Sequence, residues 1–174
     1  GCCRISTLLV GQNDYNFLAQ TVVTLSDPTN ASPVTNTPPI LYVQTGLPAA
    51  TVQINATDPD NDPLTFSLAT TAQNGMAPAV PSIVTSLSST GLLTLNTVGK
   101  GIGNKYAAQA IVSDGGATVP LDFIIQVVGV STPPQFDYSV TPANSQVIKV
   151  TPGTPILFDI KAFDTDALST VTID

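Results

Sequence analysis

The chain has 174 residues, of which 43% are hydrophobic and 10% are charged, and its formal net charge is −7. This apolar content is enough for a buried core and excludes a disordered acidic tail, while five Lys and Arg residues against twelve acids exclude binding to nucleic acid or to anionic membrane surfaces. No run of 18 or more apolar residues occurs, so we expect no membrane insertion in this window.

The first 35 residues predict the end of a β-domain. Apolar stretches at 4–10 and 15–25 flank a turn signal at 11–14, which together indicate a hairpin. A linker rich in Ser, Thr and Pro follows at 26–39. We therefore expect residues 1–35 to be the C-terminal hairpin of a preceding β-domain plus a linker.

The central segment, residues 36–131, predicts one complete β-sandwich. Apolar residues alternate along short stretches that are separated by Gly, Pro, Asn and Asp, which is typical of antiparallel sandwiches. The expected strands are 40–43, 51–57, 64–68, 83–86, 92–95, 105–113 and 121–128. No amphipathic helix is evident, so the predicted fold class is all-β, built of antiparallel β-sandwiches with no helices of note.

An acidic motif occurs twice and indicates a tandem arrangement. The sequence ATDPD at 56–60 returns 106 residues later as AFDTD at 162–166. Pro-Pro pairs at 38–39 and 133–134 lie 95 residues apart and are interpreted as interdomain linkers. Because the acidic motifs lie 106 residues apart, the second copy is 11 residues longer between its Pro-Pro pair and its acidic motif, which suggests an extended first hairpin. We expect residues 132–174 to be the N-terminal half of a following β-domain.

Asp58, Asp60 and Asp62 stand at a spacing of two after a predicted strand. Calcium takes six to eight oxygen ligands, and clustered Asp side chains with backbone carbonyls supply them. The same residues also suit a turn in which Asp side chains cap backbone groups and Pro restricts φ. The twelve-residue EF-hand loop is excluded because its Glu ligand is absent: all twelve acids of the chain are Asp.

Several motifs in order resemble a cadherin-like repeat, of the divergent kind found in large surface proteins and in dystroglycan-type, Ig-like modules. The motifs are Ala56-x-Asp58-x-Asp60 before Leu64-x-Phe66-x-Leu68, then Ser89-Thr-Gly91-Leu-Leu, then Tyr106-x-x-x-Ala110-x-Val112-x-Asp114-Gly. The resemblance covers about 38–130 well and both flanks partly. It implies tandem sandwiches of a large extracellular protein.

In the family that the chain resembles, calcium lies between domains. Its ligands are an Asp-x-Asp motif, an Asp after the penultimate strand, an acidic linker and a further acidic motif. Asp58, Asp60 and Asp114 match the first two, so the resemblance implies Ca²⁺ as the cofactor and these three residues as its ligands. Two features depart from the family: the linker at 36–39 has no acid, and 96–100 reads NTVGK where the further acidic motif would fall.

Two kinds of covalent modification are also suggested. Cys2 and Cys3 are adjacent, which allows a vicinal disulfide, bonds to cysteines elsewhere or free thiols, and we expect a disulfide of some kind. Zinc is excluded because the chain has no His and only these two Cys. Asn30 and Asn55 begin N-glycosylation triplets, although such triplets are common by chance in Thr-rich sequences.

The expected function is structural. With no His, no Glu and no nucleophile motif, we expect no enzyme activity. We expect a structural or adhesive repeat segment of an extracellular, cell-surface or filament-forming glycoprotein, with neighbouring repeats or other copies as partners. The alternative is a carbohydrate- or ligand-binding β-sandwich accessory to a secreted enzyme. An exposed cluster of Tyr15, Tyr42, Tyr106 and Tyr138 would favour carbohydrate as the ligand.

Overall fold

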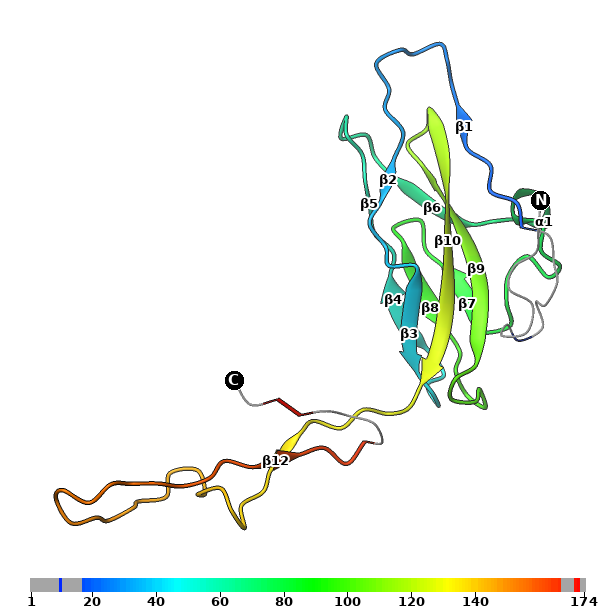
Figure 1. Ribbon diagram of the computed structural model, residues 1–174. Helices are drawn as coiled ribbons and strands as arrows, with labels where there is room; N and C mark the ends of the chain where they lie inside the picture. The colour runs from blue at the N-terminus through cyan, green and yellow to red at the C-terminus, as the bar shows by residue number, and fades with distance from the viewer. Residues whose placement is uncertain (1–9, 11–16, 167–170, 173–174) are drawn as a thin grey trace. The chain divides into compact units, whose positions relative to one another are not determined.

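A computed structural model describes residue 10, residues 17–166 and residues 171–172. The chain separates into two compact units, residues 1–129 and 130–174 (Figure 1). The first unit contains a five-stranded sheet, a three-stranded sheet and a separate two-stranded pair, and the described residues of the second unit contain one short pair of strands. Among the described residues, no helix is long and apolar enough to cross a membrane.

The larger sheet of the first unit has five strands. Four follow the order β1 (Val22–Val23), β10 (Ala117–Val128), β9 (Lys105–Ser113) and β6 (Thr65–Leu68), with all neighbours antiparallel. The fifth, β3 (Ile40–Gln44), runs parallel to the second half of β10. The β9–β10 hairpin pairs along nine positions and forms the centre of this sheet.

The smaller sheet lies behind it and is fully antiparallel (Figure 1). Its order is β4 (Ala50–Gln53), β8 (Leu92–Leu95) and β7 (Val84–Leu87). A separate two-stranded pair joins β2 (Val34–Thr35) to β5 (Ala56–Thr57). The expected strand 51–57 is therefore two strands, because the chain leaves β8 after Gln53 and pairs with β2 from Ala56.

The core lies between the two sheets and follows the alternation of the sequence. Side chains at every second position of each strand are fully buried: Leu93 and Leu95 of β8, Tyr106, Ala108, Ala110 and Val112 of β9, and Phe123, Ile125 and Val127 of β10. Burying a large apolar side chain contributes roughly 1.5–3 kcal/mol, so this core stabilises the unit strongly. The predicted all-β class is confirmed.

The described N-terminal residues belong to the first unit. β1 pairs with β10, and the backbone oxygen of Leu18 accepts a hydrogen bond of 3.0 Å from the side chain of Gln109 on β9. Gln109 and Ala107 are buried on the face of β9 opposite the core. The domain limits 1–35, 36–131 and 132–174 stay a prediction.

A single helical turn, α1 (Thr71–Asn74), interrupts the all-β pattern. The side chain of Gln73 accepts a hydrogen bond of 2.9 Å from the backbone of Thr70, and Gly75 ends the turn at φ +73°. The Thr-x-x-Gln spacing and the following Gly are the sequence signals for such a turn. With four residues, it agrees with the expectation of no helices of note.

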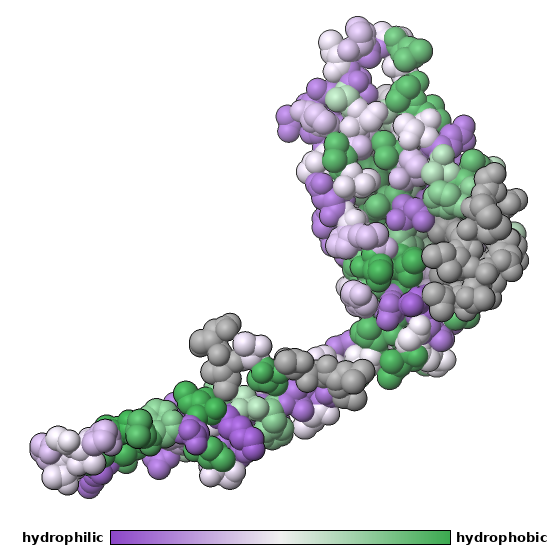
Figure 2. Space-filling view, viewed as in Figure 1, coloured by the Kyte–Doolittle hydropathy of each residue, from purple (hydrophilic) through white to green (hydrophobic). Residues whose placement is uncertain are grey.

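The second unit contains β11 (Gln135–Phe136) and β12 (Ala162–Phe163), which pair antiparallel. They are the regular elements of its described residues, 130–166 and 171–172. Between them the chain runs without regular strand pairing, and large apolar side chains there remain exposed (Figure 2).

Candidate metal centre

The loop after β5 gathers three carboxylates. One oxygen from each of Asp58, Asp60 and Asp62 lies within 4.8 Å of the others. Two oxygens that each stand about 2.4 Å from one calcium ion are at most about 4.8 Å apart, so the cluster has a span that fits a shared ion. Asp62 is a member that the sequence interpretation left out of its ligand set, although the spacing of two pointed to it.

Hydrogen bonds hold this loop in shape. Asp58 Oδ1 accepts from the backbone N–H of Asp60 at 2.9 Å and of Asp62 at 3.1 Å, and Asn61 adopts a left-handed φ of +65°. The interpretation as an Asp-capped turn is therefore confirmed in geometry. Asp58 Oδ2 is buried and has no hydrogen-bond partner among the described residues, which leaves one oxygen free for a cation.

Charge repulsion acts within the cluster. Partial burial raises the pKa of the Asp62 carboxyl, and the nearby charges of Asp58, Asp114, Asp60 and Asp27 raise it further. A carboxyl whose neighbours are all acidic ionises less readily. A divalent cation would relieve this repulsion, so the electrostatics of the loop suit calcium.

Asp114 lies in the turn between β9 and β10, where it is engaged by other groups. Its Oδ1 accepts from the backbone N–H of Gly116 at 2.7 Å and from that of Ala117, and its Oδ2 accepts from the Asn30 side chain at 3.3 Å. Burial raises the pKa of Asp114, but these hydrogen bonds lower it by more. Asp114 is thus near enough to act on Asp62 by charge, but is not one of the three clustered acids. The ligand set Asp58, Asp60 and Asp114 stays a prediction.

The segment that precedes β2 contacts this site twice. Ala31 donates its backbone N–H to Asp60 Oδ2, and Asn30 donates its side chain to Asp114 Oδ2. The Asn30 side chain also packs against Gly116, where a β-carbon would stand 3.1 Å from its amide nitrogen. The acidic loop therefore holds the segment that enters the sandwich.

The second unit repeats this arrangement. Thr132 donates its backbone N–H to Asp166 Oδ2 at 2.7 Å, and Asp166 donates its own backbone N–H to Asp164 Oδ1 at 2.7 Å. Ala31, Asp60 and Asp58 make the same two hydrogen bonds in the first unit. The two strand pairs also share one register: Val34 faces Thr57 as Gln135 faces Phe163. Equivalent residues of the two units are thus 101 positions apart in the first strand of each pair and 106 positions apart in the second strand.

A threonine brace confirms that the two hairpins correspond. Thr37 Oγ1 donates to the backbone oxygen of Asn55 at 3.0 Å and accepts its N–H at 2.8 Å. Thr141 does the same to Lys161, at 3.0 and 2.7 Å. The strand registers align residues 32–33 with the Pro-Pro pair at 133–134. Thr37 and Thr141 lie 104 residues apart, so of the five residues by which the second copy is longer, three precede Thr141 and two follow it. The second copy is thus extended as expected, but between its paired strands the excess is five residues and not the 11 counted from the Pro-Pro pairs.

The remaining sequence-predicted sites are spread over the chain. Cys2 and Cys3 lie outside the described residues. Asn55 is exposed at the junction of β4 and β5. Asn30 is partly buried and its side chain is hydrogen-bonded to Asp114, so of these two residues Asn55 is the one that is accessible for glycosylation. Both glycosylation triplets stay predictions. Tyr106 is 1% exposed in the core, so it cannot join an exposed tyrosine cluster.

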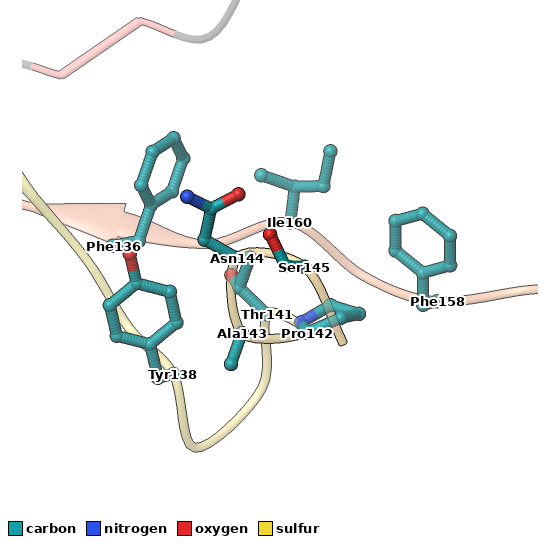
Figure 3. Close-up of a pocket in the computed structure, with 9 residues that line it drawn as sticks. All are labelled: Phe136, Tyr138, Thr141, Pro142, Ala143, Asn144, Ser145, Phe158 and Ile160. Atoms are coloured by element: carbon teal, nitrogen blue, oxygen red, sulfur yellow. The ribbon is translucent and has the colours of Figure 1, made fainter. Parts of the chain in front are cut away.

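A cavity of about 460 Å³ opens on the second unit (Figure 3). It is lined by three aromatic rings and by neutral residues, namely Phe136, Tyr138, Thr141, Pro142, Ala143, Asn144, Ser145, Phe158 and Ile160. The rings of Phe136 and Tyr138 stand 6.2 Å apart at an angle of 48°. No ionisable acid or base lines it apart from the Tyr138 phenol, so it offers no acid–base pair for catalysis.

No protein-family model matches the chain, and no curated protein does. Solved structures match it distantly. The human protocadherin-24 EC1-2 structure is 19% identical over 79% of this chain and 61% of that one, with a TM-score of 0.45. A putative α-galactosidase from Bacteroides fragilis is 15% identical over 56% of this chain and 18% of that one, with a TM-score of 0.42.

The extracellular cadherin domains 1–4 of protocadherin gamma B7 are 19% identical over 78% of this chain and 33% of that one, with a TM-score of 0.40. The chain thus spans less than two thirds of the length of each of these three proteins. The matches include cadherin domains and a glycosidase-like protein alike, and they assign the chain to no family.

Proposed function

We propose that the chain is a structural or adhesive repeat segment of an extracellular or cell-surface protein, with calcium bound at the acidic loop of each repeat. The observation that carries this proposal is the duplicated contact between the acidic loop and the segment entering the sandwich, Ala31 to Asp60 and Thr132 to Asp166. A repeated loop that holds its own linker suits a protein that keeps successive domains in a defined arrangement. It requires no catalytic residue.

The donors of the first loop suit calcium better than magnesium or zinc. Asp58, Asp60 and Asp62 offer hard carboxylate oxygens, and Asp58 Oδ2 is free to bind. Calcium tolerates irregular sets of six to eight oxygens, whereas magnesium demands a near-ideal octahedron and zinc selects His and Cys. Backbone carbonyls and water would complete the shell, since three carboxylates alone do not.

A thermal melt with calcium and with chelator tests the calcium part. A ligand that binds only the folded state stabilises it by about 2.7 kcal/mol at one hundred times its Kd, so calcium should raise the melting temperature. Asp58→Asn should abolish that rise. Asp159→Asn, a change of the same kind outside both acidic loops, should preserve it. Equal melting temperatures with calcium and with chelator would refute calcium binding and leave the spacer role standing.

The spacer role has its own test, which does not depend on calcium. Neighbouring repeats or other copies are the proposed partners, so tandem copies of the full chain should hold a constant end-to-end distance in solution scattering. A distance distribution as broad as that of a flexible linker would contradict the role. The carbohydrate-binding alternative stays a prediction, and the burial of Tyr106 weakens the tyrosine cluster that would favour it.

A further inference from the structure

Because the same hydrogen bonds occur in both units, residues of the second unit can be matched to equivalent residues of the first. Lys161 makes the same hydrogen bonds in the second unit as Asn55 does in the first, and Asp166 the same as Asp60, so equivalent residues here lie 106 positions apart. At this offset, residues 156–160 correspond to residues 50–54. Ile156, Phe158 and Ile160 therefore occupy the positions of Ala50, Val52 and Ile54. The same face of the chain is apolar in both units.

In the first unit the edge of this segment is paired with β8, whose residues lie beside it in the same sheet. Ala50 pairs with Leu95 and Val52 with Leu93, antiparallel. Leu93, Leu95 and Ile54 are completely buried, while Leu92, whose side chain points the other way, is 41% exposed. The paired strand β8 thus adds Leu93 and Leu95 to the buried face on which Ala50 and Ile54 lie.

In the second unit the equivalent face is open. Ile156, Phe158 and Ile160 are 50–55% exposed, and no strand pairs with 154–160 among the described residues. Figure 3 shows Phe158 and Ile160 on one extended segment, and both residues line the cavity of about 460 Å³ together with the loop 141–145. Apolar side chains also gather on the surface of this unit in Figure 2.

Exposure of this kind is costly. Fully burying a Phe or Ile side chain contributes roughly 1.5–3 kcal/mol, and apolar neighbours beside these three half-exposed side chains gain part of that amount for each of them. The backbone of an unpaired extended segment also offers N–H and C=O groups that an added strand satisfies. Both terms act together when a strand with alternating apolar residues docks antiparallel.

We infer that segment 154–160 of the second unit is an acceptor edge for an antiparallel β-strand of the β8 type, a segment with the alternating leucines of Gly91-Leu-Leu-Thr-Leu95. In the register of the first unit, the residue equivalent to Leu93 lies against Phe158 and that equivalent to Leu95 against Ile156. This is strand addition, in which backbone hydrogen bonds give affinity and alternate side chains give specificity. The inference is independent of calcium and goes beyond the proposed spacer role.

A synthetic peptide of residues 88–97, added to the isotope-labelled full chain, tests the inference. We expect saturable binding with a Kd below about 1 mM, and NMR shift changes confined to 136–145 and 154–161. A peptide carrying Leu93→Asp and Leu95→Asp should bind at least tenfold more weakly. A peptide carrying Leu92→Asp should bind like the original, because that side chain faces solvent in the first unit.

Variants of the full chain provide the matched experiment on the acceptor side. Phe158→Asp should abolish peptide binding, whereas Leu157→Asp should preserve it, because residue 157 lies on the opposite face and is already 90% exposed. Both positions are exposed, so neither change removes a buried contact. Absence of binding at 1 mM peptide, equal effects of the two variants, or shift changes on the first unit would overturn the inference. Self-association of the chain through 154–160 that the peptide does not compete would also overturn it, in favour of a second copy.

Discussion

The side-chain amide of Asn30 donates a hydrogen bond of 3.3 Å to the carboxylate of Asp114, 84 positions further along the chain. This bond ties the segment before β2 to the turn between β9 and β10. Together with the contact from Ala31 to Asp60, it joins three parts of the chain that are distant in sequence at one end of the sandwich. The arrangement of the acidic loops at this end of the sandwich therefore depends on Asn30, an uncharged residue outside the acidic motifs.

Asn30→Ala should loosen that end. Loss of one hydrogen bond to a charged group costs about 1–2 kcal/mol, and the pKa of Asp114 should rise towards its usual value because one donor to its charged form is removed. Chemical denaturation and NMR titration of the carboxyl measure the two effects. Asn144→Ala is the control, since that exposed side chain makes no hydrogen bond among the described residues. Unchanged stability would show that the hydrogen bond from Asn30 to Asp114 does not stabilise the fold.

Asp62 should make stability depend on pH in an unusual direction. Its pKa is raised in the folded chain, so its contribution is most favourable below the pKa of the unfolded chain and is lost as the pH rises through the folded value. In chelator, Asp62→Asn should therefore raise the melting temperature at neutral pH and leave it little changed at about pH 3. Melts at both pH values check this, and a lower melting temperature of the variant at neutral pH would contradict it.

Thr97 should tolerate no apolar replacement. Its completely buried hydroxyl donates to the backbone oxygen of Gln44 at 2.7 Å and accepts the N–H of Leu47 at 2.8 Å. Thr97→Val keeps the shape but leaves both groups unsatisfied, which costs about 1–3 kcal/mol each. Urea denaturation should show that loss, whereas Thr51→Val on the exposed side of β4 should change stability by less than about 0.5 kcal/mol. Equal effects would disprove the role of the buried hydroxyl.

Two glycines should respond differently to the same substitution. Gly91 and Gly46 both have a left-handed φ, of +86° and +84°, so alanine costs about 1–2 kcal/mol at either. At Gly91 the new β-carbon would also stand 2.6 Å from the backbone oxygen of Ile54, while at Gly46 it meets nothing within 4 Å. Denaturation midpoints should therefore fall further for Gly91→Ala. Equal midpoints would mean that the backbone of Ile54 yields easily.

Local pattern predicted most strands because their burial is itself periodic. The strand 105–113 was expected at the bounds that β9 has, since Tyr106, Ala108 and Ala110 alternate into the core. The break at Ile54 and Asn55 was not predictable from alternation, because the pattern continues while the partner strand changes from β8 to β2. Pairing partners depend on the whole sheet, whereas alternation depends on one segment.

The acidic site was predictable in part for a similar reason. Asp58, Asp60 and Asp62 are neighbours in sequence, so a single turn brings them together. Asn30 and Ala31 contribute through the path of the chain, and nothing in their local sequence indicates it. The same limit applies to the alignment of the two repeats. Residue type suggests matching the two Pro-Pro pairs, whereas the register of the paired strands matches Pro33 with Pro134.

The parallel pairing of β3 with β10 has a mechanical consequence. β3 follows the entering segment and β10 precedes the leaving one, and their five paired positions run from Ile40 beside Ile124 to Gln44 beside Val128. A pull on the two ends of the sandwich therefore slides these strands along each other. All of the rungs must yield at nearly the same moment, whereas an antiparallel hairpin would open one rung at a time. The topology thus gives a small domain of this kind resistance to stretching.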